Sequence, residues 1–279
     1  MPRSAPLLAA ATAELGSAAE ARTLLAHVTG VEPSRMLLLD DVDEAAAADY
    51  AELIARRAAG EPLQYLTGRA YFRTIEVAVA PGVFIPRPET EVMTGWALER
   101  LAKLPGEPVV VELCAGSGAI SKAIAVERPG CLQYAVELSE TAARLAQQNL
   151  SGTGVTLTEG DMADAFPELN GAVDLVIANP PYIPLTAWEY VAEDVRTHEP
   201  DLALFSGEDG LDALRVVAEV AARLLRPGGF VCAEHAEVQT DSALDVFAVR
   251  GAFTQLADHL DLTGRPRFVA GVRAANLAG

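Results

Sequence analysis

The chain has 279 residues, of which 51% are hydrophobic and 22% are charged, and its formal net charge is −18 at pH 7. A chain of this length has room for one ordinary domain plus a small one, its composition is typical of a globular protein, and no apolar run is long enough to cross a membrane. Three scattered cysteines and four scattered histidines indicate neither a disulfide framework nor a metal site, and the acidity argues against a broad surface for binding duplex nucleic acid.

The N-terminal segment is predicted to form small helices. It lacks a basic start followed by a continuous apolar stretch, so we expect no signal peptide and a cytoplasmic location. Ser17 to Glu20 has the spacing of a capping box, and Asp43 can cap a second helix that runs to Arg57. We therefore expect a helical domain over residues 1–70.

Residues 71–87 are predicted to form a linker. Alternating apolar residues indicate a strand here: Ile75, Val77 and Val79. Pro81-Gly82 is a turn signal, so we expect a β-hairpin. Pro88 suits the first turn of a helix. Arg87 and Glu89 belong either to a solvated helix start or to a loop over an active site.

From Pro108 onward, short runs rich in β-branched residues alternate with helical patterns, which predicts a doubly wound parallel sheet. The first strand, Val109 to Leu113, leads into a glycine turn: Cys114, Ala115, Gly116, Ser117 and Gly118. Two glycines permit close backbone approach at a helix N-terminus, where amide dipoles favour an anionic group. The turn lacks the third glycine of the dinucleotide fingerprint, so alone it is weak evidence for a nucleotide site.

Later strands bring acidic residues to the same edge of the sheet. The strand from Leu132 ends in Glu137, about twenty residues after the glycine turn, where a carboxylate can accept both ribose hydroxyls of a nucleoside. A third strand ends near Asp161 and Met162; the carboxylate can accept from an adenine amine, and the thioether can lie against the ring. Because parallel strands share one carboxyl edge, we expect these groups and Asn179 to lie close together.

A fourth strand runs into Asn179, Pro180, Pro181 and Tyr182. This combination suits a substrate whose planar NH₂ group must attack an electrophile. Such a nitrogen shares its lone pair with a π system and is therefore a poor nucleophile. If the Asn179 Oδ1 and the Pro180 carbonyl each accept one of its N–H bonds, its lone pair is directed away from both and the nitrogen can pyramidalise, while the Tyr182 ring packs flat against the planar group. The alternative is a rigid turn in which Tyr182 caps the core. The cofactor site upstream favours the catalytic interpretation.

The C-terminal part is predicted to complete the sheet. A helix is expected from about Leu211 to Leu225, then a strand from Phe230 to Glu234, and a last helix and two strands follow. His198 and His235 are more typical of hydrogen-bonded structural histidines than of catalysts.

Taken together, these residues resemble the class I S-adenosylmethionine-dependent methyltransferases, and more narrowly the protein-(glutamine N5) methyltransferase family that acts on peptide chain release factors. The motifs that carry the resemblance are Glu61-Pro62, Tyr65-Leu66-Thr67-Gly68, Ile85-Pro86-Arg87-Pro88-Glu89-Thr90-Glu91, the glycine turn, Asn179-Pro180-Pro181-Tyr182-Ile183, Glu199-Pro200 and Ala203-Leu204. The motif that begins at Ile85 is the most specific to this family. The Asn-Pro-Pro-Tyr motif is shared with adenine N6 methyltransferases.

The resemblance implies an α/β fold with a seven-stranded, Rossmann-like methyltransferase sheet over residues 88–279, joined by the hairpin linker to a helical domain that docks the release factor. It also implies how the ligands are held. Cys114 to Gly118 would hold the methionine part of S-adenosylmethionine, Glu137 the ribose, Asp161 and Met162 the adenine, and Asn179, Pro180, Pro181 and Tyr182 the glutamine amide of a Gly-Gly-Gln loop, with Asn179 also bordering the cofactor. The product would be S-adenosylhomocysteine, no metal is expected, and a monomer is expected.

Three positions depart from the family pattern. Glu112 and Glu137 stand where the family usually has aspartate, and at Glu112 this lengthens the reach to the amino group of the cofactor. The segment Glu234 to Gln239 differs from the usual Glu-Ile-Gly pattern.

Other functions remain open from the sequence. A sister enzyme that methylates a ribosomal-protein glutamine would share the acceptor site. Adenine-N6 methylation of nucleic acid needs a flipped base and a phosphate-binding surface, and the acidity and the absence of a large target-recognition insert argue against it. A non-catalytic binding protein would be expected to lack the amide or the glycine turn.

Overall fold

The structure, a computed structural model, describes residues 1–275 of the chain. The chain divides into two compact units, Met1–Arg69 and a larger unit that begins at Ala70. Within the described residues, no helix combines the length and the apolar character that a membrane crossing requires.

The first unit is helical, as the sequence predicts. Its elements are α1 (Ser4–Leu15), α2 (Ala18–Thr29), the 3-10 helix η1 (Pro33–Leu38), α3 (Glu44–Ala58) and α4 (Leu63–Thr67). Both predicted N-caps are present, but at Ser17 the Glu20 carboxylate pairs with Arg57 instead of completing the capping box. The Ser17 hydroxyl accepts from the Glu20 amide at 3.3 Å, and the Asp43 carboxylate accepts from the Ala46 amide at 2.8 Å. Apolar side chains of α2 and α3 pack together in the core of this unit.

A β-hairpin is present, and its strands are β1 (Arg69–Phe72) and β2 (Ile75–Ala78). The predicted position of its turn is wrong: the strands are joined at Arg73 and Thr74, not at Pro81-Gly82. Tertiary contacts hold Arg73 in the left-handed region at φ 52°, because its guanidinium donates twice to the Glu127 carboxylate at 2.8 Å and once to the Glu91 carbonyl at 2.9 Å. Pro81-Gly82 instead forms a separate turn beyond the hairpin.

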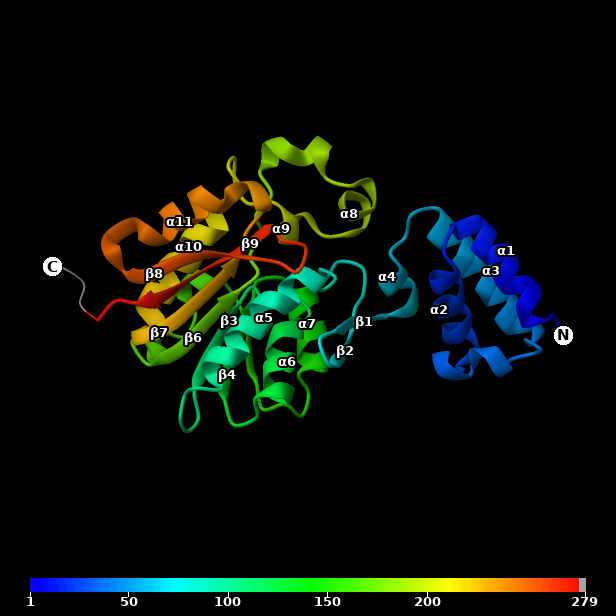
Figure 1. The fold of residues 1–279 in the computed structure, drawn as a ribbon, viewed down its shortest axis with the longest axis horizontal. Helices are drawn as coiled ribbons and strands as arrows, with labels where there is room; N and C mark the ends of the chain where they lie inside the picture. The colour runs from blue at the N-terminus through cyan, green and yellow to red at the C-terminus, as the bar shows by residue number, and fades with distance from the viewer. Residues whose placement is uncertain (276–279) are drawn as a thin grey trace. The chain divides into compact units, whose positions relative to one another are not determined.

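The larger unit is built on a seven-stranded sheet in the order β5-β4-β3-β6-β7-β9-β8, which confirms the predicted sheet (Figure 1). The strands are β3 (Val109–Leu113), β4 (Leu132–Glu137), β5 (Thr156–Glu159), β6 (Val173–Ala178), β7 (Leu225–Glu234), β8 (Phe253–Leu260) and β9 (Pro266–Arg273). The first five strands of the order are parallel, and β9 pairs antiparallel with both β7 and β8. The last two strands therefore complete the sheet, as predicted, and they do so in antiparallel pairing.

The helices of this unit connect or flank the strands. They are α5 (Pro88–Leu101), α6 (Ala119–Glu127), α7 (Glu140–Asn149), α8 (Glu193–His198), α9 (Asp201–Leu204), α10 (Asp212–Leu224) and α11 (Thr240–Ala248), with 3-10 helices η2 (Met162–Asp164), η3 (Pro167–Leu169), η4 (Leu185–Tyr190), η5 (Glu237–Gln239) and η6 (Val249–Gly251). The sheet is extended in one direction from β3 to β4 and in the opposite direction from β6 to β7. Right-handed crossovers therefore place α6 and α10 on opposite faces. The order reverses between β3 and β6, where open α/β sheets bind ligands.

Strand β7 begins earlier than predicted. Leu225 already pairs with Val173, and a register shift lies between this pair and the next, so the strand includes the Pro-Gly-Gly segment that separates the predicted helix from the predicted strand. Gly229 permits this, because a Cβ at this position would lie 3.0 Å from the Val173 carbonyl.

Candidate active site

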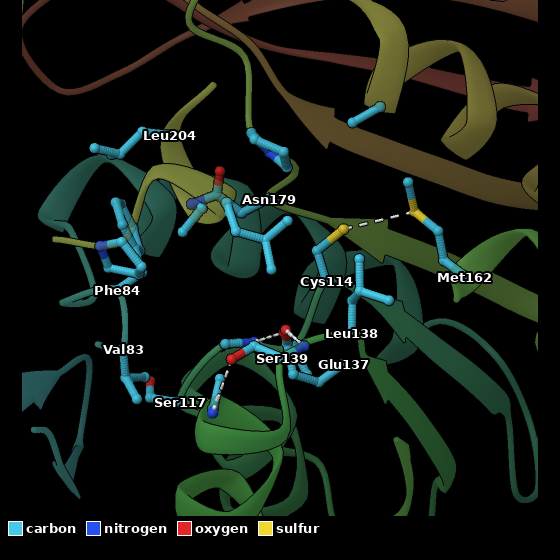
Figure 2. A pocket seen from close by; sticks show the side chains of 18 of the residues that line it. Val83, Phe84, Cys114, Ser117, Glu137, Leu138, Ser139, Met162, Asn179 and Leu204 are labelled. Carbon is cyan, nitrogen blue, oxygen red and sulfur yellow. Dashed lines mark hydrogen bonds between the residues drawn. The ribbon is translucent and has the colours of Figure 1, made fainter. Parts of the chain in front are cut away.

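A cavity of about 410 Å³ opens at the carboxyl edge of the sheet, a normal size for a small-molecule site. Its wall includes most of the predicted site residues: Cys114, Ala115, Gly116, Ser117, Glu137, Asp161, Met162, Asn179, Pro181 and Tyr182. Gly118 and Pro180 do not line it. Figure 2 shows residues from several strand ends and from the loop that contains Val83 and Phe84 surrounding the same space.

The glycine turn redirects the chain from β3 into α6 through residues in the left-handed region. Cys114 has φ 60°, Gly116 has φ 55° and Gly118 has φ 78°. A Cβ at Gly116 would meet nothing within 4 Å, so the backbone there is open to a ligand in the cavity that it lines. A Cβ at Gly118 would instead lie 3.1 Å from the Leu150 side chain. Gly118 therefore serves helix packing rather than the wall of the cavity.

Glu137 is held rigidly at the end of β4. One carboxylate oxygen accepts from the Gly116 amide at 2.7 Å, and the other accepts from the Ser139 amide at 2.8 Å (Figure 2). Each carboxylate oxygen has a second lone pair, so both remain able to accept from a pair of hydroxyls. Glu137 thus joins the glycine turn to the start of α7 in one cavity wall.

Glu112, in β3, is also buried on this wall. Its carboxylate accepts from the Ser121 amide at 2.9 Å and from the Ser121 hydroxyl. Burial raises the pKa of Glu112 to about 8, with a smaller contribution from the negative charge of Glu137, while the two bonds from Ser121 oppose the shift. A cation placed near Glu112 would favour its ionised form.

The adenine end expected from the sequence lies at the end of β5. Asp161 is exposed, and its carboxylate accepts from the Ala163 amide at 2.9 Å at the start of η2. The Met162 sulfur lies 3.5 Å from the Cys114 sulfur (Figure 2). Burial raises the pKa of the Cys114 thiol, so this side chain remains a neutral donor. Leu138, which the sequence analysis did not single out, adds an exposed apolar surface to the same wall.

A buried polar chain supports the predicted acceptor group. Asn179 Nδ2 donates to the Thr90 hydroxyl oxygen at 3.2 Å, and that hydroxyl donates to Glu234 Oε2 at 2.7 Å. The Tyr182 hydroxyl donates to the other oxygen of Glu234 at 3.3 Å. Burial raises the pKa of Glu234 to about 7 and also raises the pKa of Tyr182. Thr90 and Glu234 were not among the predicted site residues; their signal in the sequence is their place in a family motif and at a strand end.

Two loops that line the cavity are joined by an ion pair. The Arg87 guanidinium contacts the buried Glu199 carboxylate, which also accepts from the Ile85 amide at 3.4 Å. Burial raises the pKa of Glu199, and the charge of Arg87 opposes this shift. Arg87, the N-cap residue of α5, is therefore paired with the buried Glu199 carboxylate rather than simply solvated.

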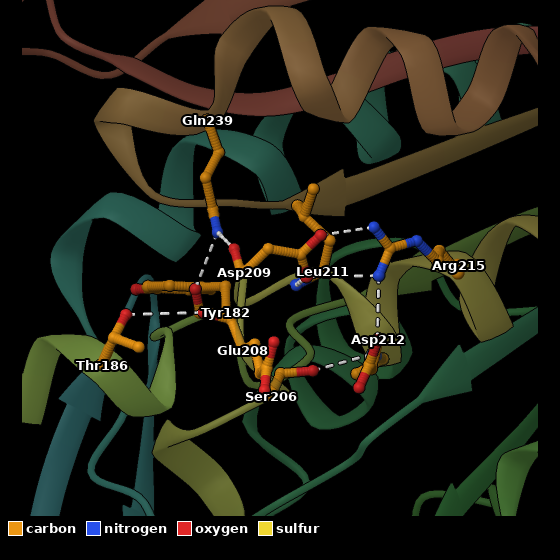
Figure 3. A network of polar contacts seen from close by, with 10 residues as sticks. Tyr182, Thr186, Ser206, Glu208, Asp209, Leu211, Asp212, Arg215 and Gln239 are labelled. Carbon is orange, nitrogen blue, oxygen red and sulfur yellow. Dashed lines mark hydrogen bonds and ion pairs between the residues drawn. The ribbon is translucent and has the colours of Figure 1, made fainter.

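Gln239, the last residue of the segment Glu234 to Gln239, holds the acceptor loop through its side chain (Figure 3). Gln239 Nε2 donates to the Tyr182 carbonyl at 2.9 Å and to the Asp209 carbonyl at 3.2 Å, and its Oε1 accepts from the Ala236 amide at 2.9 Å. His235 is fully buried and bonds to Asp258 at 2.8 Å, outside the wall of the cavity. It has the structural role expected for it.

The cavity fits the cofactor that the resemblance implies. The open backbone of Gly116 leaves room for the methionine part, two carboxylates suit its ammonium group and the ribose hydroxyls, and apolar side chains line the adenine end.

Comparison with known proteins covers both units. Two family models match, one described as "PrmC N-terminal domain" over residues 6–68 and one described as "Methyltransferase small domain" over residues 74–194. A curated protein from Streptomyces coelicolor named release factor glutamine methyltransferase is 50% identical over 256 residues, which are 91% of this chain and 90% of that protein.

Two further similarities concern a different acceptor and the fold. A Streptomyces pristinaespiralis protein named 4-amino-L-phenylalanine/4-methylamino-L-phenylalanine methyltransferase is 41% identical over 85% of this chain and 81% of its own length. A crystal structure of a methyltransferase from Pyrococcus furiosus is similar with a TM-score of 0.51 and 17% identity, covering 71% of this chain and 88% of that one.

Proposed function

The chain belongs to the release factor glutamine methyltransferase family, and we propose that it transfers the methyl group of S-adenosylmethionine to the side-chain nitrogen N5 of the glutamine in the Gly-Gly-Gln motif of peptide chain release factors. The observation that carries the proposal is the orientation of the Asn179 amide. Its Nδ2 donates to Thr90, whereas Oδ1 accepts from no residue that the structure describes. An oxygen acceptor is thus left for a ligand in the cavity.

The cofactor is proposed to lie along the wall from the glycine turn to Asp161. Gly116 would face its methionine part, Glu137 would accept from the ribose hydroxyls, and Asp161 would accept from the adenine amine with Met162 against the ring. When bound, S-adenosylmethionine supplies an electrophilic methyl group and leaves as S-adenosylhomocysteine.

The acceptor loop is proposed to activate the amide nitrogen. The Asn179 Oδ1 and the Pro180 carbonyl each accept one N–H bond of the glutamine amide, which directs the nitrogen lone pair toward the methyl donor. None of the backbone hydrogen bonds of the loops and turns in residues 1–275 ends on the Pro180 carbonyl. Because Pro180 is buried and does not line the cavity, the proposal requires the loop to turn this carbonyl toward the glutamine amide. The Tyr182 ring would pack against the amide plane. As the nitrogen–carbon bond forms, the carbon–sulfur bond breaks, and the alkylated nitrogen then loses one proton to water.

The domain roles are part of the same proposal. Residues 1–70 would dock the release factor, residues 71–87 would act as the hairpin linker, and residues 88–279 would form the methyltransferase domain. A monomer acting in the cytoplasm, where release factors work, is the proposed state.

A competing acceptor is an aromatic amine, because one relative is named for methylation of 4-amino-L-phenylalanine. An aromatic NH₂ group presents the same two N–H bonds to Asn179 and Pro180. The similarity therefore makes the choice of acceptor a matter for direct measurement.

The decisive experiment uses purified protein and S-adenosylmethionine carrying a labelled methyl group. Separate reactions contain the release factors of the source organism, the same factors with Gly-Gly-Gln changed to Gly-Gly-Ala, ribosomal proteins, DNA, and 4-amino-L-phenylalanine. We expect label on the release factors and none on the alanine variants. Label that enters only ribosomal proteins, DNA or the aromatic amine would overturn the proposed substrate.

A further inference from the structure

The Asn179 carboxamide can adopt two orientations of nearly the same shape, and only one of them presents Oδ1 to the substrate amide. Rotating a carboxamide by 180° exchanges its oxygen and its NH₂ group with little change in packing. Only the orientation with Oδ1 toward the glutamine amide can accept its N–H, because in the reverse orientation the NH₂ groups of Asn179 and glutamine would face each other. The enzyme therefore needs contacts that favour one orientation of the Asn179 amide over the other.

The hydrogen bonds from Asn179 to Thr90 and from Thr90 to Glu234 provide such contacts, because each of them has a defined donor and acceptor. An ionised carboxylate accepts hydrogen bonds and cannot donate them. The single hydroxyl hydrogen of Thr90 is therefore committed to Glu234 Oε2, at 2.7 Å. The Thr90 oxygen is left as an acceptor, and only the NH₂ side of Asn179 can bond to it, at 3.2 Å.

Burial protects these hydrogen bonds from competition by water. Thr90 is 3% exposed and Glu234 is 1% exposed, so water does not readily replace either partner. The other oxygen of Glu234 accepts from the Tyr182 hydroxyl at 3.3 Å, so one carboxylate holds both the amide and the aromatic ring of the acceptor loop. Thr90 belongs to α5 and Glu234 ends β7, which places both on regular elements.

We propose, on the premise of the proposed function, that Thr90 and Glu234 are positioning residues of the methyl transfer, and that they hold the Asn179 amide with Oδ1 toward the glutamine nitrogen. Neither touches the reacting atoms in this proposal. They act through Asn179 and Tyr182.

The ionisation state of Glu234 determines whether these bonds favour one orientation of the Asn179 amide. Burial and the nearby Glu89 favour its neutral form, while Thr90, Tyr182 and Arg267 favour its ionised form, and the pKa is about 7. A protonated Glu234 can donate to the Thr90 oxygen, which frees the Thr90 hydrogen to point at Asn179. The rotated amide then becomes acceptable, so the fraction of correctly oriented enzyme falls as the pH falls through about 7.

The first test replaces the hydroxyl and then restores it. Thr90→Val keeps the shape and removes the bond, and we expect kcat to fall at least about tenfold with little change in the KM of the release factor or the affinity for S-adenosylhomocysteine. Thr90→Ser should recover kcat to within about threefold of the parent. Thr94→Val is the matched control: Thr94 is buried one turn later in α5 and its hydroxyl donates to the Thr90 carbonyl, so turnover should stay unchanged.

The pH profile and a spectroscopic readout separate positioning from a structural role. In the parent, kcat should rise through pH 7, and in Glu234→Gln this inflection should disappear. The side-chain NH₂ resonance of Asn179, assigned by its loss in Asn179→Ala, should titrate near pH 7 in the parent and not in Thr90→Val. This NMR measurement needs no acceptor, so it tests the inference even if the proposed substrate is wrong.

Two results would overturn the inference. One is parent-like turnover in a folded Thr90→Val protein. The other is an Asn179 resonance that is indifferent both to pH and to the loss of the Thr90 hydroxyl.

Discussion

Three carboxyl groups near the cavity show how single residues acquire different properties from their surroundings. Glu137 is bonded by two backbone amides, Glu112 is bonded by the amide and hydroxyl of Ser121, and Glu234 is bonded by two hydroxyls. Burial is the largest cause of the raised pKa values of Glu112 and Glu234, at about 8 and about 7. At neutral pH these two are therefore partly protonated, and a bound cation or a nearby donor changes their charge.

At the residue scale, the binding and catalytic roles should separate in two substitutions. Asn179→Ala removes one acceptor of the transition state, so turnover should fall by about 10²–10³-fold while S-adenosylhomocysteine binds nearly as before. Glu137→Ala should mainly weaken cofactor binding, at least about tenfold, because hydrogen bonds to a charged group are lost. Calorimetry and initial rates measure both effects, with melting temperatures as the check on folding. Near-normal turnover in Asn179→Ala would contradict its assigned role.

Glu112 leads to a prediction about protons. Its pKa in the folded protein lies above the ordinary 4.5, so its ionisation opposes folding, and the stability it contributes is complete below pH 4.5 and is lost as the pH rises through about 8. The ammonium group of S-adenosylhomocysteine should favour the ionised form. We therefore expect binding at pH 7 to release protons and to tighten as the pH rises toward 8. Titration calorimetry in phosphate and in Tris measures the release. Equal release in the parent and in Glu112→Gln would assign the proton to another group.

At the element scale, the acceptor loop after β6 depends on the segment that follows β7. Gln239 bonds to the Tyr182 carbonyl. Gly210 lies close to both groups: a Cβ at Gly210 would be 2.3 Å from the Tyr182 carbonyl oxygen and 2.6 Å from Gln239 Nε2. Figure 3 shows the Gln239 side chain bonded to Tyr182 and to Asp209. The segment Glu234 to Gln239, which departs from the family pattern, thus holds the loop through both its first and its last residue.

Gly210→Ala should displace this loop, because the added methyl group meets backbone rather than a flexible side chain. We expect turnover to fall at least about tenfold and the protein to be destabilised by more than the ~1–2 kcal/mol that a left-handed alanine alone costs. Gly171→Ala is the matched control, since Gly171 also has a positive φ, of 70°, but has nothing within 4 Å of its Cβ position. Rate assays and denaturant melts compare the two variants. Similar loss of turnover in both would exclude a specific effect on the loop.

At the scale of the whole molecule, the entire cavity wall belongs to the unit that begins at Ala70. A ligand that binds one folded unit stabilises that unit by mass action, by about 2.7 kcal/mol at a concentration one hundred times the Kd. We expect calorimetry to resolve two unfolding transitions, of which S-adenosylhomocysteine shifts only one. The control is Glu137→Ala, in which the shift should shrink. A ligand that raised both transitions equally would show that the two units unfold together.

Local chemistry was sufficient for much of the fold. The caps at Ser17 and Asp43, the strand from Val109 to Leu113 and the left-handed glycine turn are determined by residues within a few positions of one another, so they are readable in the sequence. The rule that parallel strands share a carboxyl edge then brought Glu137 and Asn179 to one cavity, although their contacts with ligands remain predictions.

Only the tertiary structure decided the features that depend on distant partners. The hairpin turn lies at Arg73 because Glu127 holds its guanidinium, and no local turn signal marks that position. Thr90 meets Glu234 across 144 positions of sequence, and their bond settles which way the Asn179 amide points. The sequence alone predicted Asn179 as the side chain that accepts from the substrate amide, because residue type and strand ends are local properties. Its orientation was decided by packing, because a buried hydrogen bond acquires its direction from whatever the fold places on its other side.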